Sequence, residues 1–459
     1  MDLACELARY AVNLTYDAIP ADALEATKKD ILDTLGTALA GSGAAGCREV
    51  VELVKEWGGR RDATVIAYGG RVPPPSAALA NAIMAHALDF DDTHDGAILH
   101  AGVPVVPAAF AIAERRGDVA GKEFLTAVTL GIDVACRLGL SAPPAGLSRP
   151  GFTRTTTVAW FSSAITAGKL LRLTEEQMVN AIGIAYAQVA GNRQCIPDGA
   201  LTKRLQPALA SRGGVTAAQM AARGVTGAKN SFEGVMGYFR LYCRDVYDRE
   251  AAVSGLGQRF EGVNLGFKPY PSCRFTHGFI DAALALRDRL AGKLDAITEI
   301  RAVIGQESLQ RDLVEPLEVK QRPRTIVDAQ FSIPYTVATA LVKGAVVMSD
   351  FTDAAIRDER VLAVSTRVRP RVEPDLMAQR LPPSILEVAL DGATLTQRID
   401  YPFGDPQNPM SPEALARKFR DCASHSVRRI PRSRIERAID VVAHMEKVDD
   451  AGAVIRALG

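Results

Sequence analysis

The stretch AALANAIMAHALDF, residues 77–90, decides the fold of this chain. It is small and apolar nearly all round, as in a helix that is buried on every side. Three further stretches predict helices by the same kind of spacing: KKDILDTLGTALAG (28–41), VAWFSSAITAGKLLRL (158–173) and GGVTAAQMAARGVTG (213–227). Alanine and glycine let helix backbones approach closely, so we expect a tightly packed helical body.

The bulk composition limits the classes of function. The chain has 459 residues, 47% of them hydrophobic, and a net charge of +1. This charge argues against nucleic-acid binding, which needs a concentrated basic face. The seven cysteines are scattered and form no CxxC pair, which favours a reducing compartment. No export signal or membrane-spanning run is apparent, and we expect a cytoplasmic protein with no membrane partner.

The pattern changes after about residue 270. ITEIRAVIG (297–305) and VLAVSTRVRPRV (361–372) predict strands, and AQFSIPYTVATALVKG (329–344) predicts a helix. The pair Asp391-Gly392 between two alternating runs indicates a hairpin, and Ser411-Pro412-Glu413 opens a final helical part. The expected fold is mainly α. A large all-α domain comprises residues 1–265 and 401–459, and residues 266–400 form a smaller α+β domain.

The densest group of reactive side chains lies between His86 and His100. It contains three of the six histidines of the chain, and four aspartates lie within the seven residues 89–95. On a helix, His86, Asp89 and Thr93 would share one face. Neighbouring carboxylates repel each other, so some group must pair with them or use them. The alternatives are a helix end with capping aspartates and a site for a divalent metal, although no HExxH or DxDxDG spacing occurs.

Two other segments carry cations. Thr202-Lys203-Arg204, expected ahead of the helix near 213–222, suits carboxylate binding or is a solvated pair at a helix start. The segment 267–277 holds two prolines in an extended loop. Its polar side chains suggest anion binding and proton transfer, or else a decorated linker: Lys268, Tyr270, Arg274 and His277.

The segment GSGAAG (41–46) matches the dinucleotide-binding pattern GxGxxG. That pattern requires a preceding strand, whereas the preceding residues here have helical periodicity. We therefore interpret it as a turn between two helices.

Five segments in the same order resemble the MmgE/PrpD family. They are HALDFDDTHDGAILHAGVPVVPAA, TKRLQPALASRGGVTAAQMAARGVTG, FKPYPSCRFTH, AQFSIPYTVATAL and GDPQNPMSPEALARKF. The family includes 2-methylcitrate dehydratase, cis-aconitate decarboxylase and iminodisuccinate epimerase. The resemblance implies a helical domain built from both chain ends, an α+β lid domain and a homodimer. It also implies an active site between the domains and no obligatory metal or organic cofactor.

The resemblance also implies the site residues. The matching positions are Asp89, Thr93, His100, Lys203, Lys268 and Tyr335. Many members have a histidine in a Gly-aromatic-His-x-Thr segment, where this chain has Thr153 followed by Arg154. Threonine is no general base at neutral pH, which weakens the link to the decarboxylase. Arg154 would supply a carboxylate clamp instead.

The sequence thus predicts a cofactor-independent lyase, a hydro-lyase similar to 2-methylcitrate dehydratase. It would remove a proton next to a carboxylate of a small di- or tricarboxylate. His100 or Lys268 would be base or acid, Asp89 would orient one of them, and Thr93 would hydrogen-bond the substrate. Lys203, Arg274 and Arg154 would bind carboxylates. The alternatives are an epimerase of an amino- or imino-dicarboxylate, a metal-dependent hydrolase using the Asp/His cluster, and a binding protein.

Overall fold

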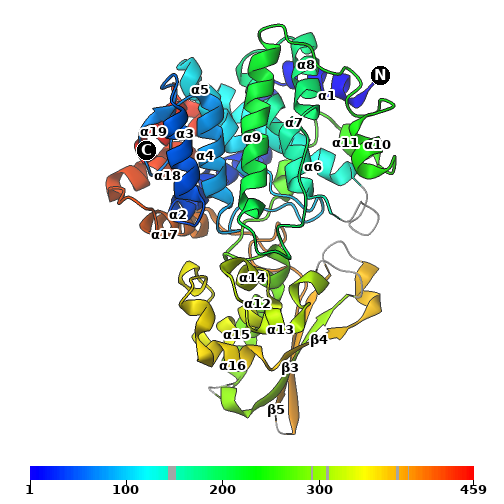
Figure 1. Cartoon of the computed structure of the whole chain (residues 1–459), viewed down its shortest axis with the longest axis vertical. Helices are drawn as coiled ribbons and strands as arrows, with labels where there is room; N and C mark the ends of the chain where they lie inside the picture. Colours follow the sequence, from blue (N-terminus) through cyan, green and yellow to red (C-terminus); the bar gives the residue numbers. More distant parts are fainter. Residues whose placement is uncertain (143–150, 291–292, 306–309, 379–381, 391) are drawn as a thin grey trace. The chain divides into compact units, whose positions relative to one another are not determined.

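The computed structural model describes residues 1–459 except 143–150, 291–292, 306–309, 379–381 and 391. The chain is mainly α-helical and forms two compact units (Figure 1). Unit 1 comprises Met1–Arg193, Leu201–Phe267 and Ser411–Gly459. Unit 2 comprises Gln194–Ala200 and Lys268–Met410.

Unit 1 is built from helices of both chain ends, and Figure 1 shows the C-terminal helix α17 beside the N-terminal α2. The helices from the N-terminal side are α1 Leu3–Asn13, α2 Ala21–Gly41, α3 Cys47–Trp57, α4 Pro74–His86, α5 Gly102–Arg116, α6 Gly121–Ser141, α7 Arg154–Leu170, α8 Glu175–Tyr186, α9 Thr202–Ala221, α10 Tyr238–Cys243 and α11 Arg249–Val253. The C-terminal segment adds α17 Pro412–Ser424, α18 Arg432–Ala443 and α19 Gly452–Leu458.

Small residues let the central helices of unit 1 touch. A Cβ atom at Gly131 of α6 would lie 1.9 Å from Oγ1 of Thr166 in α7. A Cβ atom at Gly214 of α9 would lie 2.6 Å from the backbone nitrogen of Ala164 in α7. A capping box of Thr174 and Gln177 starts α8. The expectation of close helix packing is confirmed.

Three predictions for unit 1 were wrong in detail. Unit 1 is not entirely helical, because β1 Ala63–Thr64 and β2 Arg71–Val72 pair antiparallel. Gly69 and Gly70, both with positive φ, make the turn between these strands. Helix α9 begins at Thr202, so Lys203 lies inside it, and it ends at Ala221 rather than near Gly227. Gly227 instead packs against Gly183 of α8, which leaves no room for a side chain.

Helix α4 ends earlier than its apolar pattern predicts. The pattern continues to Phe90, whereas the helix stops at His86. Asp89 has a φ of +52°, in the left-handed region, so the chain turns out of the helical path there. His86, Asp89 and Thr93 therefore do not share a helix face.

Unit 2 contains a four-stranded sheet in the order β4-β3-β5-β6. Strand β3 pairs in parallel with β4, and antiparallel pairs join β3 to β5 and β5 to β6. Helices α12 and α15 share one hydrophobic core with the sheet. The elements are α12 His277–Leu290, β3 Ile297–Ile304, α13 Leu317–Gln321, α14 Ile326–Gln330, α15 Ile333–Lys343, α16 Glu359–Ser365, β4 Val368–Val372, β5 Ser384–Leu390 and β6 Ala393–Ile399.

The hairpin prediction is confirmed by the pairing of Leu390 with Ala393, although Asp391 itself lies outside the described residues. The strand predicted over 361–372 is wrong in its first half. There Asp358 caps helix α16 by accepting a hydrogen bond from the backbone of Arg360, and β4 starts only at Val368. The helix predicted over 329–344 is interrupted, because Ser332 caps a new helix, α15, after α14 has ended.

The expectation that no run is apolar enough to span a membrane was wrong for α6, which is long and apolar enough by length and composition. Of its most apolar window, 94% is buried inside the protein, as in the core helix of a globular fold.

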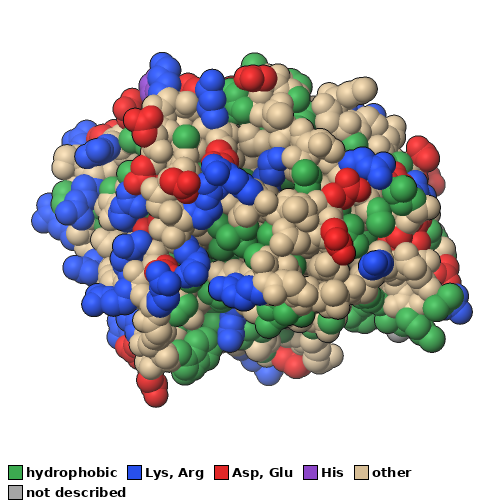
Figure 2. Space-filling view, turned by 90° about the horizontal axis from the view of Figure 1, so that it is seen from above, with side chains coloured by type: hydrophobic (Ala, Val, Ile, Leu, Met, Phe, Trp, Pro, Cys, Tyr) green, Lys and Arg blue, Asp and Glu red, His purple; other side chains and the backbone are tan. Residues whose placement is uncertain are grey.

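Figure 2 shows lysine and arginine side chains gathered at the left of one face, the side on which α18 and α19 lie in Figure 1. Acidic groups are interleaved with them, since Glu436 pairs with both Arg420 and Arg432.

Candidate active site

The segment that follows α4 forms the candidate site in unit 1. His86 is the last residue of α4, and the left-handed turn at Asp89 redirects the chain. Thr93 then exchanges two backbone hydrogen bonds with Gly266, at 2.8 and 2.7 Å. His94 and Leu99 pair across a tight turn, which brings the chain back at His100. The backbone thus returns His100 to the end of α4.

Lys203 links this segment to α9. Its ammonium group forms an ion pair with Asp89 and lies 3.1 Å from Nε2 of His86. Lys203 is the second residue of α9, where the helix dipole disfavours a positive charge by about 0.3–1 kcal/mol. The charge of Lys203 therefore does not stabilise α9, and the ion pair with Asp89 offsets the unfavourable interaction with the helix dipole.

Asp91 contacts both imidazoles with one oxygen. Its Oδ2 lies 2.8 Å from Nδ1 of His86 and 3.2 Å from Nδ1 of His100. The Nδ1 atom of His100 also lies 2.7 Å from the backbone oxygen of Asp92. The two rings meet edge to face, with centroids 4.8 Å apart. Asp91 and His86 are buried, whereas the side chains of His100 and Lys203 each keep 16% of their surface exposed.

The charges of this group follow from its burial. Burial, which disfavours an imidazolium, lowers the pKa of His86 to about 4, and the Lys203 charge works in the same direction. Burial by itself would raise the pKa of Asp91, but the interactions with His100 and His86 outweigh it and hold that pKa well below its usual range. At neutral pH His86 is therefore uncharged and Asp91 is ionised.

Asp92 holds the start of α5. Its carboxylate accepts hydrogen bonds from the backbone nitrogens of Ala101, at 2.7 Å, and Gly102, at 3.1 Å. Burial and the neighbouring Asp91 raise the pKa of Asp92 to about 7. Burial also raises the pKa of Asp30, on α2, well above its usual value, and Asp92 adds to this rise. The raised pKa values favour the uncharged form of both carboxyl groups, which lowers the cost of enclosing them in unit 1.

Other predicted residues of unit 1 lie around the same segment. Thr93 is buried, and its hydroxyl has no hydrogen-bond partner among the described residues. Arg154, the first residue of α7, donates to the backbone oxygen of Ala97, and Thr155 accepts from the backbone nitrogen of His100. Thr153, just ahead of α7, donates to the hydroxyl of Thr156 at 2.8 Å. The first turn of α7 thus packs against the turn that leads to His100.

The remaining predicted residues belong to unit 2. Lys268 is buried and follows Gly266 by two residues in the chain. Arg274 pairs with Asp405 at 3.2 Å. Tyr335 lies in the core of unit 2 and donates its hydroxyl to the backbone oxygen of Asp350 at 2.6 Å. This contact gives Tyr335 a structural role inside the unit.

His86, Asp89 and His100 offer one ligand atom each within 4.8 Å of one another, a spacing that suits a metal ion. The ammonium group of Lys203 already lies against two of these three side chains. A metal ion would have to displace this ammonium. The geometry fits a hydrogen-bonded ion-pair network better than a metal centre.

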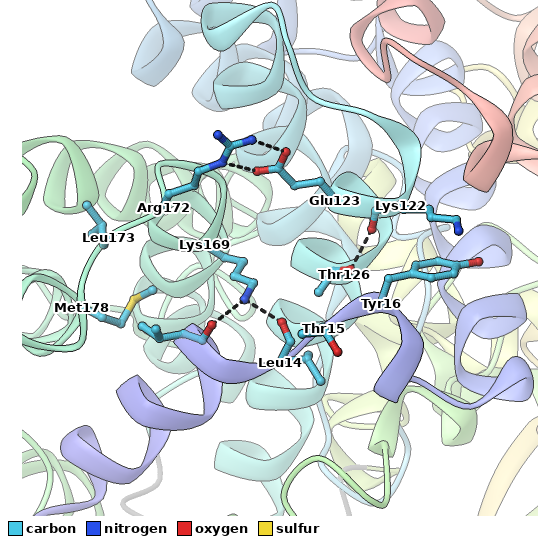
Figure 3. A pocket seen from close by; sticks show the side chains of 11 residues that line it. Leu14, Thr15, Tyr16, Lys122, Glu123, Thr126, Lys169, Arg172, Leu173 and Met178 are labelled. Atoms are coloured by element: carbon cyan, nitrogen blue, oxygen red, sulfur yellow. Dashed lines mark hydrogen bonds and ion pairs between the residues drawn. The ribbon is translucent and has the colours of Figure 1, made fainter.

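A separate cavity of about 380 Å³ lies elsewhere in unit 1, between the end of α1 and helices α6, α7 and α8 (Figure 3). Its cations already have partners within the protein. Lys169 donates to the backbone oxygens of Val12 and Leu14, and Arg172 forms a two-point contact with Glu123. Lys169 and Arg172 are thus engaged by the fold, and none of the predicted site residues lines the cavity.

Comparison with known protein families shows what this chain is related to. A model of the MmgE/PrpD N-terminal domain matches residues 5–249, and a model of the MmgE/PrpD C-terminal domain matches residues 270–444. The chain belongs to the MmgE/PrpD family. Both matches together cover most of the chain, including α4, α9 and the segment from His86 to His100.

Several characterised members of the MmgE/PrpD family are similar over most of their length. The cis-aconitate decarboxylase of Aspergillus terreus is 27% identical over 99% of this chain and 96% of its own. The Homo sapiens enzyme of that name is 26% identical over 94% of this chain and 89% of its own. The 2-methylcitrate dehydratase of Escherichia coli (strain K12) is 24% identical over 82% of this chain and 80% of its own.

Sequence reasoning did not single out Asp91, the carboxylate that contacts both imidazoles. We expected Asp89 to orient His100 or Lys268, whereas the structure places Asp91 against His100 and His86. The spacing of five residues between His86 and Asp91 was visible in the sequence. It indicates this contact only if the helix ends at His86, which the apolar pattern did not predict.

Proposed function

We propose that this protein is a lyase that removes a proton from the carbon next to a carboxylate of a small polycarboxylate. One observation carries the proposal. The Nδ1 atom of His100 lies against a carboxylate and a backbone carbonyl, both of which can only accept hydrogen bonds from it. In the neutral ring, Nε2 therefore carries the lone pair of a general base. The relatives named as a decarboxylase and a dehydratase of tricarboxylates support the same class of reaction.

The neighbours of His100 suit the rest of such a reaction. Removal of the proton builds negative charge on the adjacent carboxylate, which a nearby cation stabilises. Lys203 provides an ammonium group, held in place by Asp89 and His86. The same ammonium group can donate a proton to a leaving hydroxyl in a dehydration. Thr93 offers the substrate a buried hydroxyl without a partner among the described residues.

The substrate needs further cations. In the segment described above, the ammonium group of Lys203 is already paired with Asp89, and Asp91 contacts the two imidazoles. Further carboxylates on the substrate therefore need cations from outside this group. The sequence predicts Arg154 for this role, together with Lys268 and Arg274 of unit 2. The lid role of unit 2 stays a prediction as well.

The proposal is tested by following proton exchange in deuterated water. The protein is incubated with citrate, 2-methylcitrate, cis-aconitate and matched dicarboxylates, and proton NMR detects deuterium incorporation and new alkene signals. We expect exchange or elimination with at least one tricarboxylate. Replacing His100 by alanine should lower that rate about 10² to 10³-fold, the contribution of a positioned base.

His425, which is exposed on unit 1 and contacts only its own helix turn in the described structure, provides a matched control. His425→Ala should keep the wild-type rate. The assignment of the base is wrong if His100→Ala is folded, by circular dichroism, and still exchanges at the wild-type rate. Deuterium exchange with inversion of the centre and no alkene would instead favour the epimerase.

We further propose that the protein forms a homodimer through the outer faces of α3 and α9. Trp57 and Leu53 of α3 and Met220 of α9 are exposed, at 47%, 42% and 42%. The guanidinium of Arg212 in α9 lies 4.8 Å from the centre of the Trp57 ring, so the two helices share one surface. An exposed apolar patch of this kind is typical of an association surface.

Sedimentation velocity at micromolar concentration should give twice the 49.0 kDa mass of the chain. Trp57→Asp should shift the protein to the monomer, because it removes the largest apolar side chain of this surface and puts a charged group in its place. A wild-type protein that sediments as a monomer would end this proposal.

A further inference from the structure

Asp91 is the one residue that contacts both imidazoles of the candidate site through the same oxygen in the described part of the chain. It lies 2.8 Å from Nδ1 of His86 and 3.2 Å from Nδ1 of His100. It is completely buried, and its second oxygen, Oδ1, has no hydrogen-bond partner among the described residues. Burying an ionised carboxylate away from water costs free energy. The contacts of Oδ2 with the two ring nitrogens offset that cost.

These contacts set the tautomer of each ring. An ionised carboxylate only accepts hydrogen bonds, so Nδ1 of both rings must carry the proton. Nε2 of the neutral His86 is then bare and accepts a hydrogen bond from the ammonium of Lys203, 3.1 Å away. When His100 acts as the base, its Nε2 is bare as well. The Asp91 carboxylate thus leaves Nε2 of His100 able to accept a proton. Through His86 it also helps to position the ammonium group of Lys203.

Asp89, the nearest competitor for this role, is committed to Lys203 by an ion pair. Asp92 uses both carboxylate oxygens to accept from the backbone at the start of α5 and reaches His100 only with its backbone oxygen. A side-chain substitution at Asp92 therefore leaves that carbonyl in place. Asp91 is the carboxylate that contacts both rings, and it shares the Nδ1–H of His100 with the backbone oxygen of Asp92.

We infer that Asp91 is a positioning residue that fixes the Nδ1–H tautomers of His86 and His100 at the same time and so couples the base to the Lys203 ammonium. This inference rests on the proposed function, because it assigns Asp91 a role in that proton transfer. It adds to the proposal a residue that acts through two others and does not itself contact the substrate.

The substitution Asp91→Asn tests the inference. An amide offers one acceptor oxygen and one donor NH₂ group, so it cannot accept from two Nδ1–H groups with equivalent geometry. At least one ring must turn or change its tautomer. We expect kcat to fall about 10²-fold, less than the roughly 10⁴-fold loss after the same change in a Ser-His-Asp triad, because the backbone oxygen of Asp92 still accepts from His100. The nitrogen-15 NMR spectrum should show at least one ring losing its Nδ1–H signal.

Asp30→Asn is the matched control. Asp30 is also a completely buried aspartate of unit 1. Burial raises its pKa and so favours the protonated form, which an amide imitates. This variant should keep kcat within about threefold. It should leave the spectra of both rings unchanged, because the Asp91 carboxylate and the Asp92 backbone oxygen still accept from them.

The wild-type spectrum alone can also decide the matter if Asp91→Asn does not fold. Wild-type His86 and His100 should both be Nδ1–H tautomers, and an Nε2–H tautomer on either ring would overturn the inference. Unchanged tautomers together with an unchanged kcat in folded Asp91→Asn would overturn it as well. If no polycarboxylate reacts with the wild type, the proposed function fails, whereas the tautomer measurements still test the placement of Asp91.

Discussion

Lys203→Met is expected to lower kcat/KM for the true substrate about 10³-fold, the effect of losing one preorganised electrostatic group in an enclosed site. The methionine keeps the length of the side chain but removes the ammonium group. Asp89 would then lack its ion-pair partner, and His86 would lose the donor at Nε2. The uncompensated Asp89 would also repel an incoming polycarboxylate, so KM should rise while kcat falls. Steady-state kinetics on the substrate found by deuterium exchange measures both.

A second substitution separates charge from proton transfer. Asp89→Asn combined with Lys203→Met removes the repulsion but does not restore a proton donor. We expect the double variant to recover part of the loss in KM and none of the loss in kcat. The Lys203→Met variant should still fold, because the substitution removes a positive charge from the start of α9, where the helix dipole disfavours one. If folded Lys203→Met keeps kcat within tenfold of the wild type, the ammonium group has no part in the chemistry.

The helices were predictable from the sequence because their signal is local. Alanine-rich runs such as 77–86 are apolar on all sides, and only a buried helix satisfies that pattern. The hairpin between Leu390 and Ala393 was equally predictable, because alternating runs flank a turn sequence. In both cases neighbouring residues alone determine the structure.

The end of α4 was not predictable in this way. Leu88 and Phe90 extend the apolar pattern, and the break depends on the left-handed backbone at Asp89. Asp89 in turn pairs with Lys203, 114 residues further along the chain. For the same reason the sequence could identify a cluster of histidines and aspartates but could not tell which carboxylate faces which ring. Such assignments depend on where the backbone turns, and no short pattern records that.

Lys418→Met is expected to destabilise the protein by about 3–5 kcal/mol, the usual result of breaking a buried ion pair from one side. Lys418 lies on α17, near the end of the chain, and donates to Asp33 of α2 at 2.6 Å and to the backbone oxygen of Phe90 at 2.7 Å. Its ammonium group also lies 3.9 Å from the centre of the Phe90 ring. The substitution would leave the buried Asp33 carboxylate without its cation and the Phe90 carbonyl without this donor.

Urea denaturation followed by circular dichroism measures this loss, with Arg417→Ala as the control. Arg417 is the neighbouring cation on α17, with an exposed side chain and a 3.9 Å contact to Glu413, and its removal should change stability by less than about 0.5 kcal/mol. Replacing Asp33 by leucine together with Lys418→Met should recover much of the lost stability, because neither member of the ion pair is then left as an unpaired buried charge. Phe90 directly precedes Asp91, so Lys418→Met should also lower activity more than an equally destabilising substitution in unit 2. Equal losses of activity would mean that Lys418 stabilises the fold without supporting the segment that carries Asp91 and His100.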